Sequence, residues 1–261
     1  MSAKVSRKVV CLGVAAFLSV YGLLWWAASS QRERLPDFSQ YVTAEERKAA
    51  FTGFLAPLIN NVQAEILSER RSVLDIEQAF KDNGNLNEMQ WFQLRQLSGK
   101  YLRIENPDRA DSAELIADLR LRVDIIPTDL TLAQAALESG WGSSYFARQG
   151  NNLFGMRCFR PGCGMRPRWS LVQLPYGYSR YASPRESIEA YMLNLNRHEA
   201  YQDLRRERSL QRARGTWPNS RTLSGTLDNY AEDPNYIRSI RRILNDNPEW
   251  TELMAIGHDP D

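Results

Sequence analysis

The first apolar feature of the chain is a run of twenty uncharged residues from Val9 to Ala28. Three basic residues precede this run, and Trp25 and Trp26 stand near its end. A helix of that length spans about 30 Å, which matches the hydrocarbon core of a bilayer. Tryptophan also favours the membrane–water interface. The pattern therefore predicts a membrane anchor within residues 1–30.

A cleavable signal peptide is the alternative, because Ala27 and Ala28 are small residues of the kind found at cleavage sites. The apolar run is longer than the roughly 7–15 residues usual in such peptides, which favours a retained anchor. Basic residues flank the run on both sides and leave its orientation open. Since long domains are exported largely regardless of charge, we expect a single-pass inner-membrane protein with the domain that follows the anchor in the periplasm.

Beyond the anchor, apolar residues recur at helical spacing. Thr43 and Glu46 form a capping-box pattern that predicts a helix start, and Pro57 is expected to interrupt or kink that helix. Ser183 and Pro184 predict a capped start for a later helix, with Glu186 as the acid of its capping box. The other helices are predicted over residues 85–103, from Asp111 to before Pro127, from Thr128 as cap through Leu137, and from Asp233 to Leu244.

Residues 156–181 differ from these stretches, since they combine Gly, Pro, Arg and aromatic residues with short alternating runs such as RWSLVQL and YSRY. This composition predicts a small, irregular β-rich lobe inserted between helices. The fold class is therefore α+β and predominantly helical. We expect an anchor at 1–30, a helical preface at 31–110, a main domain at 111–250 and a tail at 251–261. An arginine-rich stretch is expected to form a loop, and its arginines are Arg205, Arg206, Arg208, Arg212 and Arg214.

Composition narrows the range of partners. The 261 residues carry a net charge of only +2, which gives no reason to expect a nucleic-acid partner. Cys158 and Cys163 flank a Pro-Gly turn in CFRPGC, and in an exported domain this pair predicts a small-loop disulfide. With only two histidines in the chain, no metal site is predicted.

One acid stands out in the segment TLAQAALESGWGSSYF. Glu138 directly follows the apolar face of a predicted helix, and Gly140 and Gly142 come just after it. A carboxyl at the wall of a cleft, shielded by Trp141 and other aromatic rings, would have a raised pKa and could act as a general acid. The alternative is an ordinary solvated acid near a helix end.

Four ordered motifs carry a family resemblance. They are ALESGWG at 136–142, NNLFG at 151–155, RYASPRESIEAYMLNL at 180–195 and YAEDPNYI at 230–237. Together they make residues 112–247 resemble the bacterial glucosaminidases of the lysozyme-like superfamily, and most of all the membrane-associated Bax-type group. The resemblance implies a lysozyme-like main domain with a small β lobe. It also implies hydrolysis of the β-1,4 bond after N-acetylglucosamine in peptidoglycan, without a cofactor.

The resemblance further implies roles for single residues. Glu138 matches the catalytic acid, which would protonate the glycosidic oxygen. Tyr230 matches an active-site tyrosine that could orient the N-acetyl group or the attacking water. Asn152 and Phe154 match residues that could bond to or stack on the sugar, although core packing and turn formation are alternatives. Two aromatic residues within the motifs complete the predicted substrate-binding set, namely Trp141 and Tyr181.

The sequence departs from the family in one respect. Many members carry a second catalytic glutamate in the β lobe, whereas the stretch from Ser139 to Arg185 contains seven arginines and no acid. Without that glutamate, the 2-acetamido group of the substrate could assist the reaction. A water held by Tyr230 could also react, with Asp228, Glu232 or Asp233 as the base. The alternative function is that of a catalytically inactive peptidoglycan-binding or envelope scaffold protein. The arginines could attract the carboxylates of peptidoglycan stems or simply solvate the lobe.

Overall fold

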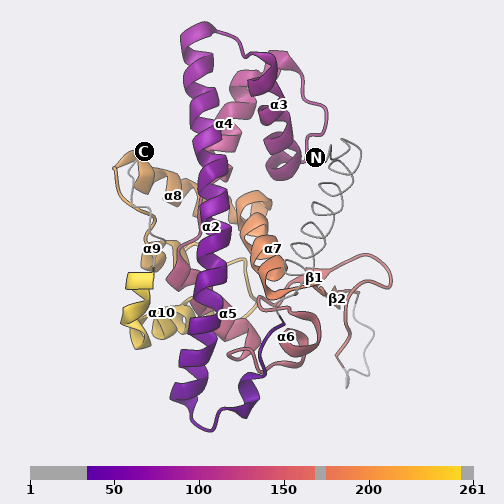
Figure 1. Cartoon of the computed structure of the whole chain (residues 1–261), viewed down its shortest axis with the longest axis vertical. Coiled ribbons are helices and arrows are strands. Elements are labelled where there is room, and N and C mark those ends of the chain that lie inside the picture. The colour runs from indigo at the N-terminus through magenta and orange to yellow at the C-terminus, as the bar shows by residue number, and fades with distance from the viewer. Residues whose placement is uncertain (1–33, 168–174, 254–261) are drawn as a thin grey trace, which may run out of the picture. The chain divides into compact units, whose positions relative to one another are not determined.

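The structure, a computed structural model, describes residues 34–167 and 175–253 (Figure 1). The predicted anchor over Val9–Ala28 and the alternating run RWSLVQL at 168–174 lie outside these ranges. Within them, none of the helices combines the length and the apolar character that a membrane crossing requires.

The described chain is predominantly helical with a small two-stranded sheet, as the sequence predicts. Strands β1 (Arg157–Cys158) and β2 (Gly177–Tyr178) pair antiparallel, and a bridge joins Met165 to Tyr178. The helices are α2 (Ala44–Asn83), α3 (Glu88–Leu97), α4 (Ser112–Arg122), α5 (Thr128–Ser139), α6 (Tyr145–Gly150), α7 (Pro184–Arg197), α8 (Gln202–Ala213), α9 (Ser220–Ser224) and α10 (Tyr236–Asp246). Short 3-10 or π turns cover Phe38–Gln40, Ser98–Leu102, Arg109–Asp111, Glu199–Tyr201 and Pro248–Leu253.

The long helix α2 connects the preface to the main domain. Its first half packs with α5 and α7 in one apolar core, and its second half packs with α3 and α4 in another (Figure 1). The described residues from Leu35 onward accordingly belong to one compact unit. The predicted boundary near residue 110 therefore separates two parts of a single unit.

Helix α2 begins as predicted, since Thr43 and Glu46 form a complete capping box. The prediction that Pro57 interrupts this helix is wrong, because the helix continues through it for 40 residues in all. Proline removes the hydrogen bond to the carbonyl four residues earlier, here that of Gly53. Both residues lie on the exposed side of the helix, where water can satisfy that carbonyl.

Three smaller details of the predicted helix starts need correction. Thr128 does not cap α5; it is the first residue of the helix, and its hydroxyl donates to the Asn60 side chain of α2. Ser183 caps α7 as predicted, but the Glu186 carboxylate accepts from the backbone N–H of Ala182, not of Ser183. The last α-helix begins at Tyr236, and Asp233 precedes it in a turn.

The arginine-rich stretch is a helix, α8, so the loop predicted there is wrong. Arg205 and Arg208 point into the protein and are almost completely buried. Arg205 donates to the carbonyls of Leu195 and His198 at the end of α7. Arg208 donates to the carbonyls of Leu121 and Arg122 at the end of α4. These guanidinium groups donate to carbonyls that helix ends leave unpaired. Their positive charges also interact favourably with the negative ends of the helix dipoles.

A buried ion cluster forms where α2, α4 and α8 meet. Asp124, with its side chain 2% exposed, accepts two hydrogen bonds from Arg212 at 2.8 and 3.1 Å. Arg70 and Arg208 reach the same carboxylate at 3.4 and 3.8 Å. Burial alone would raise the pKa of Asp124, but Arg208, Arg212 and Arg70 together hold that pKa below its ordinary value.

Candidate active site

Glu138 lies in the last turn of α5, at the wall of a cleft. The helix ends because Gly140 adopts a left-handed conformation, with φ 58°, and donates its N–H to the carbonyl of Ala136. Glu138 is half-buried and lines a cavity of about 690 Å³. Desolvation raises the pKa of its carboxyl to about 7, and the Tyr236 hydroxyl and the Arg157 charge only partly oppose that rise. A large fraction of this carboxyl is therefore protonated at neutral pH.

A chain of buried hydrogen bonds holds this carboxyl in place. The hydroxyl of Tyr236 bonds to Glu138 and accepts from the Gln134 side-chain amide at 2.9 Å. Gln134 in turn accepts a hydrogen bond from the hydroxyl of Tyr191. Because Tyr191 and Gln134 are fully buried and their polar groups are paired, the network restricts the position of Glu138.

The backbone of Gly155 lies against the other side of the carboxyl. A Cβ atom at this position would stand 2.7 Å from Oε2 of Glu138, and the residue has a φ of 64°. Glycine alone combines that conformation with so close an approach. The NNLFG motif thus places a side-chain-free backbone next to the acid.

Tyr230 and Phe154, both predicted site residues, line the same cavity as Glu138. The Tyr230 hydroxyl donates to the carbonyl of Phe154 at 2.8 Å, and its ring stacks on Tyr236 with centroids 5.5 Å apart. Burial raises the pKa of Tyr230 well above its ordinary value, so the group remains protonated. The Phe154 ring is buried and stacks on Tyr191 with centroids 4.0 Å apart.

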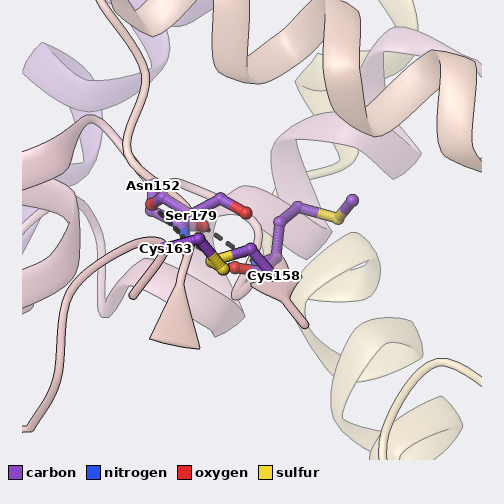
Figure 2. The surroundings of a disulfide bond; sticks show 5 residues. Asn152, Cys158, Cys163 and Ser179 are labelled. Carbon is purple, nitrogen blue, oxygen red and sulfur yellow. Dashed lines mark hydrogen bonds between the residues drawn. A yellow bond between two sulfur atoms is a disulfide. The ribbon is translucent and has the colours of Figure 1, made fainter. Parts of the chain in front are cut away.

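Asn152 also borders the cavity, but its amide group is engaged within the protein. The amide nitrogen donates to the carbonyls of Met156 and Ser179, and its oxygen accepts from the N–H of Met156. Figure 2 shows Asn152 beside the disulfide that joins Cys158 and Cys163. The side chain therefore ties the two arms of the β lobe together, which is the turn-stabilising alternative for this residue.

The other two predicted substrate-binding residues lie away from this cavity. Trp141 packs edge-on against Phe51 and near Trp250, with Lys48 over its ring. Trp141 has a left-handed backbone conformation, with φ 56°, and its side chain does not line the cavity of Glu138, so the predicted shielding of the acid by Trp141 within the cleft is absent. Tyr181 lines a separate cavity beside α2 and α7.

Aromatic and charged residues form the walls of the cleft. On the lobe side, Phe146 stacks on Tyr178 with centroids 3.9 Å apart, and Phe159 is highly exposed. Arg157 comes from β1 and reaches Glu232 on the opposite wall at 3.4 Å. Asp228 and Glu232 line the cavity with Glu138, whereas Asp233 caps the following turn and lines a different pocket. The cleft can therefore hold a chain with apolar faces and polar edges, as sugars have.

Sequence reasoning missed Tyr236, Gln134 and Gly155. A signal for Gln134 was present, because it is a polar residue within the apolar stretch LAQAAL, and a buried amide requires partners. Tyr236 and Gly155 belong to the family motifs but had no assigned role. Their role depends on closeness to Glu138, which spacing along the chain does not reveal.

We predict that Tyr236→Phe raises the pKa of Glu138 above its value of about 7. The substitution removes a hydrogen bond that lowers this pKa, while the desolvation that raises it remains. NMR titration of the labelled glutamate carboxyl measures the shift directly. Tyr41→Phe, at a ring that stacks on Phe38 outside the cavity, is the control and should leave the titration unchanged. A titration of Glu138 identical in both variants would contradict the assigned hydrogen bond.

We predict that replacing both cysteines, Cys158→Ser with Cys163→Ser, loosens the β lobe. A bridge across so short a loop contributes about 2 kcal/mol, and in this lobe few other regular hydrogen bonds are present among the described residues. Amide exchange at Met165 and Tyr178, which bond to each other's carbonyls at 2.7 and 2.8 Å, should accelerate. Amides in α5 serve as the internal reference and should keep their protection. Unchanged exchange at the Met165–Tyr178 bridge would contradict the prediction.

Comparison with known proteins matches the chain to one family. The glucosaminidase family model, described as mannosyl-glycoprotein endo-beta-N-acetylglucosaminidase, matches residues 113–249. The protein bax of Escherichia coli is 34% identical over 182 residues, which cover 69% of this chain and 62% of that protein. The peptidoglycan hydrolase FlgJ of Salmonella typhimurium is 26% identical over 167 residues, covering 57% of this chain and 50% of that protein.

The chain thus spans less than two thirds of the length of each of these curated relatives. Among solved structures, the catalytic domain of the autolysin Auto from Listeria monocytogenes aligns with a TM-score of 0.42 and 15% identity. That alignment covers 97% of this chain and 99% of the autolysin domain. Since the family model accounts for more than half of the chain and includes Glu138, Gly155, Tyr230 and Tyr236, the chain belongs to the glucosaminidase family.

Proposed function

We propose that the protein is a glycoside hydrolase that cleaves the β-1,4 bond after N-acetylglucosamine in peptidoglycan, with Glu138 as the general acid. One observation carries the proposal, namely a half-buried carboxyl with a pKa of about 7 at the wall of a 690 Å³ cleft. A general acid works best when its pKa is near the operating pH. Membership of the glucosaminidase family and similarity to a peptidoglycan hydrolase support the choice of substrate.

In the proposed reaction Glu138 donates its proton to the glycosidic oxygen as the bond to the N-acetylglucosamine carbon breaks. The transition state then has oxocarbenium character at that carbon. The Tyr236 hydroxyl bonds to Glu138 and accepts from Gln134, so the carboxyl is oriented before the substrate arrives. The aromatic wall formed by Phe146 and Tyr178 offers faces on which sugar rings can stack.

The second half of the reaction has two routes. Glu232 and Asp228 line the cleft with Glu138, and either could activate a water as general base. The 2-acetamido group of the substrate could instead attack its own anomeric carbon. The Tyr230 hydroxyl is directed to the Phe154 carbonyl, which holds the NNLFG backbone near the acid. The anomeric configuration of the first product separates the routes, because inversion supports a base-activated water and retention supports substrate assistance.

Product analysis tests the function. The purified full chain is incubated with murein, and the soluble fragments are identified by mass spectrometry. A reducing N-acetylglucosamine end is the expected result. An anhydromuramic end would overturn the assigned bond and reaction. Binding to murein without any fragments would instead favour the catalytically inactive binding or scaffold protein.

We also propose that the protein is anchored in the inner membrane through Val9–Ala28, with the cleft facing the periplasm and its peptidoglycan. The apolar run and the two tryptophans near its end support this proposal. Added protease should leave the protein uncut in intact cells. In spheroplasts, the protease should digest residues 34–253. Recovery of the full chain in the soluble fraction would contradict it.

A further inference from the structure

Of the seven arginines in the stretch from Ser139 to Arg185, the six that the structure describes have different surroundings. Arg185 pairs with Glu65 at 2.6 Å and with Glu189 at 2.8 Å, and Arg180 donates to the carbonyl of Gln149. Arg157 instead lines the same cavity as Glu138. Its charge is close enough to the acid to lower the pKa of Glu138. A group bound at Arg157 would therefore lie beside the bond to be cleaved.

A strand and an aromatic ring position the Arg157 side chain. Arg157 belongs to β1, directly before Cys158 of the disulfide. The guanidinium carbon lies 4.4 Å from the centre of the Tyr176 ring, an arrangement in which the flat group rests on the ring. The strand, the bridge and the ring thus limit the positions that the side chain can adopt.

The ion partner of Arg157 is held only weakly. The contact from Nη1 to Glu232 is 3.4 Å long, and the Glu232 side chain is 89% exposed while that of Arg157 is 40% exposed. Exposed pairs of this kind contribute little, because water solvates both charges. The bond uses one of the five N–H donors of the guanidinium. Another carboxylate could therefore replace Glu232 at low cost and bind with two parallel hydrogen bonds.

We propose that Arg157 is the receptor for a carboxylate of the glycan, and that Glu232 occupies this position until the glycan binds. The occupant in the structure is itself a carboxylate, which indicates the chemical class that fits. This inference rests on the proposed function and adds to it. Peptidoglycan differs from uncharged N-acetylglucosamine polymers by the carboxylates on its lactyl-peptide stems, so Arg157 selects the stem-bearing glycan.

The test measures binding with turnover blocked. Glu138→Gln is introduced into the full chain, and Kd values are measured for soluble murein chains and for the same chains with their carboxylates amidated. Adding Arg157→Gln should weaken binding of the native chains by about 10- to 100-fold, and by much less for the amidated chains. Arg157→Lys should recover part of the loss, since it keeps the charge but not the fork of donors. Glu232→Gln should leave binding of native chains equal or tighter.

Arg180→Gln is the matched control, because it removes a lobe arginine that does not line the cleft. It should leave both Kd values unchanged. If Arg157 acts only by positioning active-site groups, its substitution should weaken binding of both glycans equally. The ratio of the two Kd values therefore isolates the contact with the carboxylate. Equal losses on native and amidated chains, or no loss on either, would overturn the carboxylate receptor while leaving the proposed function intact. Failure of the Glu138→Gln parent to bind either glycan would contradict the proposed function itself.

Discussion

Glu138→Gln should reduce glycan cleavage by about 100- to 10,000-fold, the range that a positioned general acid contributes. Glutamine preserves the shape of the side chain but carries no acidic proton, and no other carboxyl replaces it in the last turn of α5. Release of soluble fragments from labelled murein measures the loss. Glu114→Gln, an exposed acid on α4, is the matched control and should retain full activity. Activity within about tenfold of the native protein would exclude Glu138 as the acid.

The same carboxyl predicts how activity depends on pH. A general acid works in its protonated form, so the rate should fall as pH rises through the pKa of about 7. An unperturbed glutamate would place that fall near 4.5. A profile measured between pH 4 and 9 distinguishes the two cases.

A stability measurement shows whether Glu138→Gln acts through chemistry and not through unfolding. The pKa of Glu138 is raised on folding from 4.5 to about 7, so the folded state loses stability as pH rises through this interval. Above pH 7 the cost is about 3 kcal/mol at most. Glu138→Gln removes the ionisable group and should therefore be at least as stable as the native protein at pH 8. A lower Tm for this variant at pH 8 would contradict the desolvated environment of the acid.

Asp124→Asn should have the largest effect on stability, about 3–5 kcal/mol. The substitution removes the carboxylate charge that Arg70, Arg208 and Arg212 share, so these buried guanidinium groups lose an ion partner. In a unit of this size the loss corresponds to a fall in Tm of roughly 10 °C, which calorimetry measures. Asp203→Asn removes an exposed partner of Arg206 on α8 and should change stability by less than about 1 kcal/mol.

The pH dependence of this effect has a defined sign. Because the pKa of Asp124 is lowered on folding, its contribution is present above the unfolded pKa near 3.8 and is lost as pH falls through the folded value. The native protein and Asp124→Asn should therefore differ most near neutral pH and converge in acid. A constant difference in the free energy of unfolding down to about pH 2 would contradict the ion cluster as its cause.

The sequence alone was sufficient for several features whose interacting residues are close together in the chain. Thr43 and Glu46 are three residues apart and form their capping box, and Ser183 accepts from the N–H of Glu186. The disulfide between Cys158 and Cys163 is equally local. Glu138 was found because a lone acid beside an apolar helix face coincides with a family motif. Such features depend on neighbouring residues and on helical periodicity, both of which the sequence contains directly.

Tertiary structure decided the features that depend on distant partners. Arg205 and Arg208 suggest a solvated loop by composition, yet they are buried because the carbonyls at the ends of α7 and α4 lie opposite them. Gln134 meets Tyr236 across 102 positions of the chain. Trp141, three residues after Glu138, packs against Phe51 of α2 and does not line the cleft. The sequence by itself singled out Glu138 and predicted most of the helices, whereas the raised pKa of this carboxyl and its hydrogen-bond partners exist only once burial brings these separate segments together.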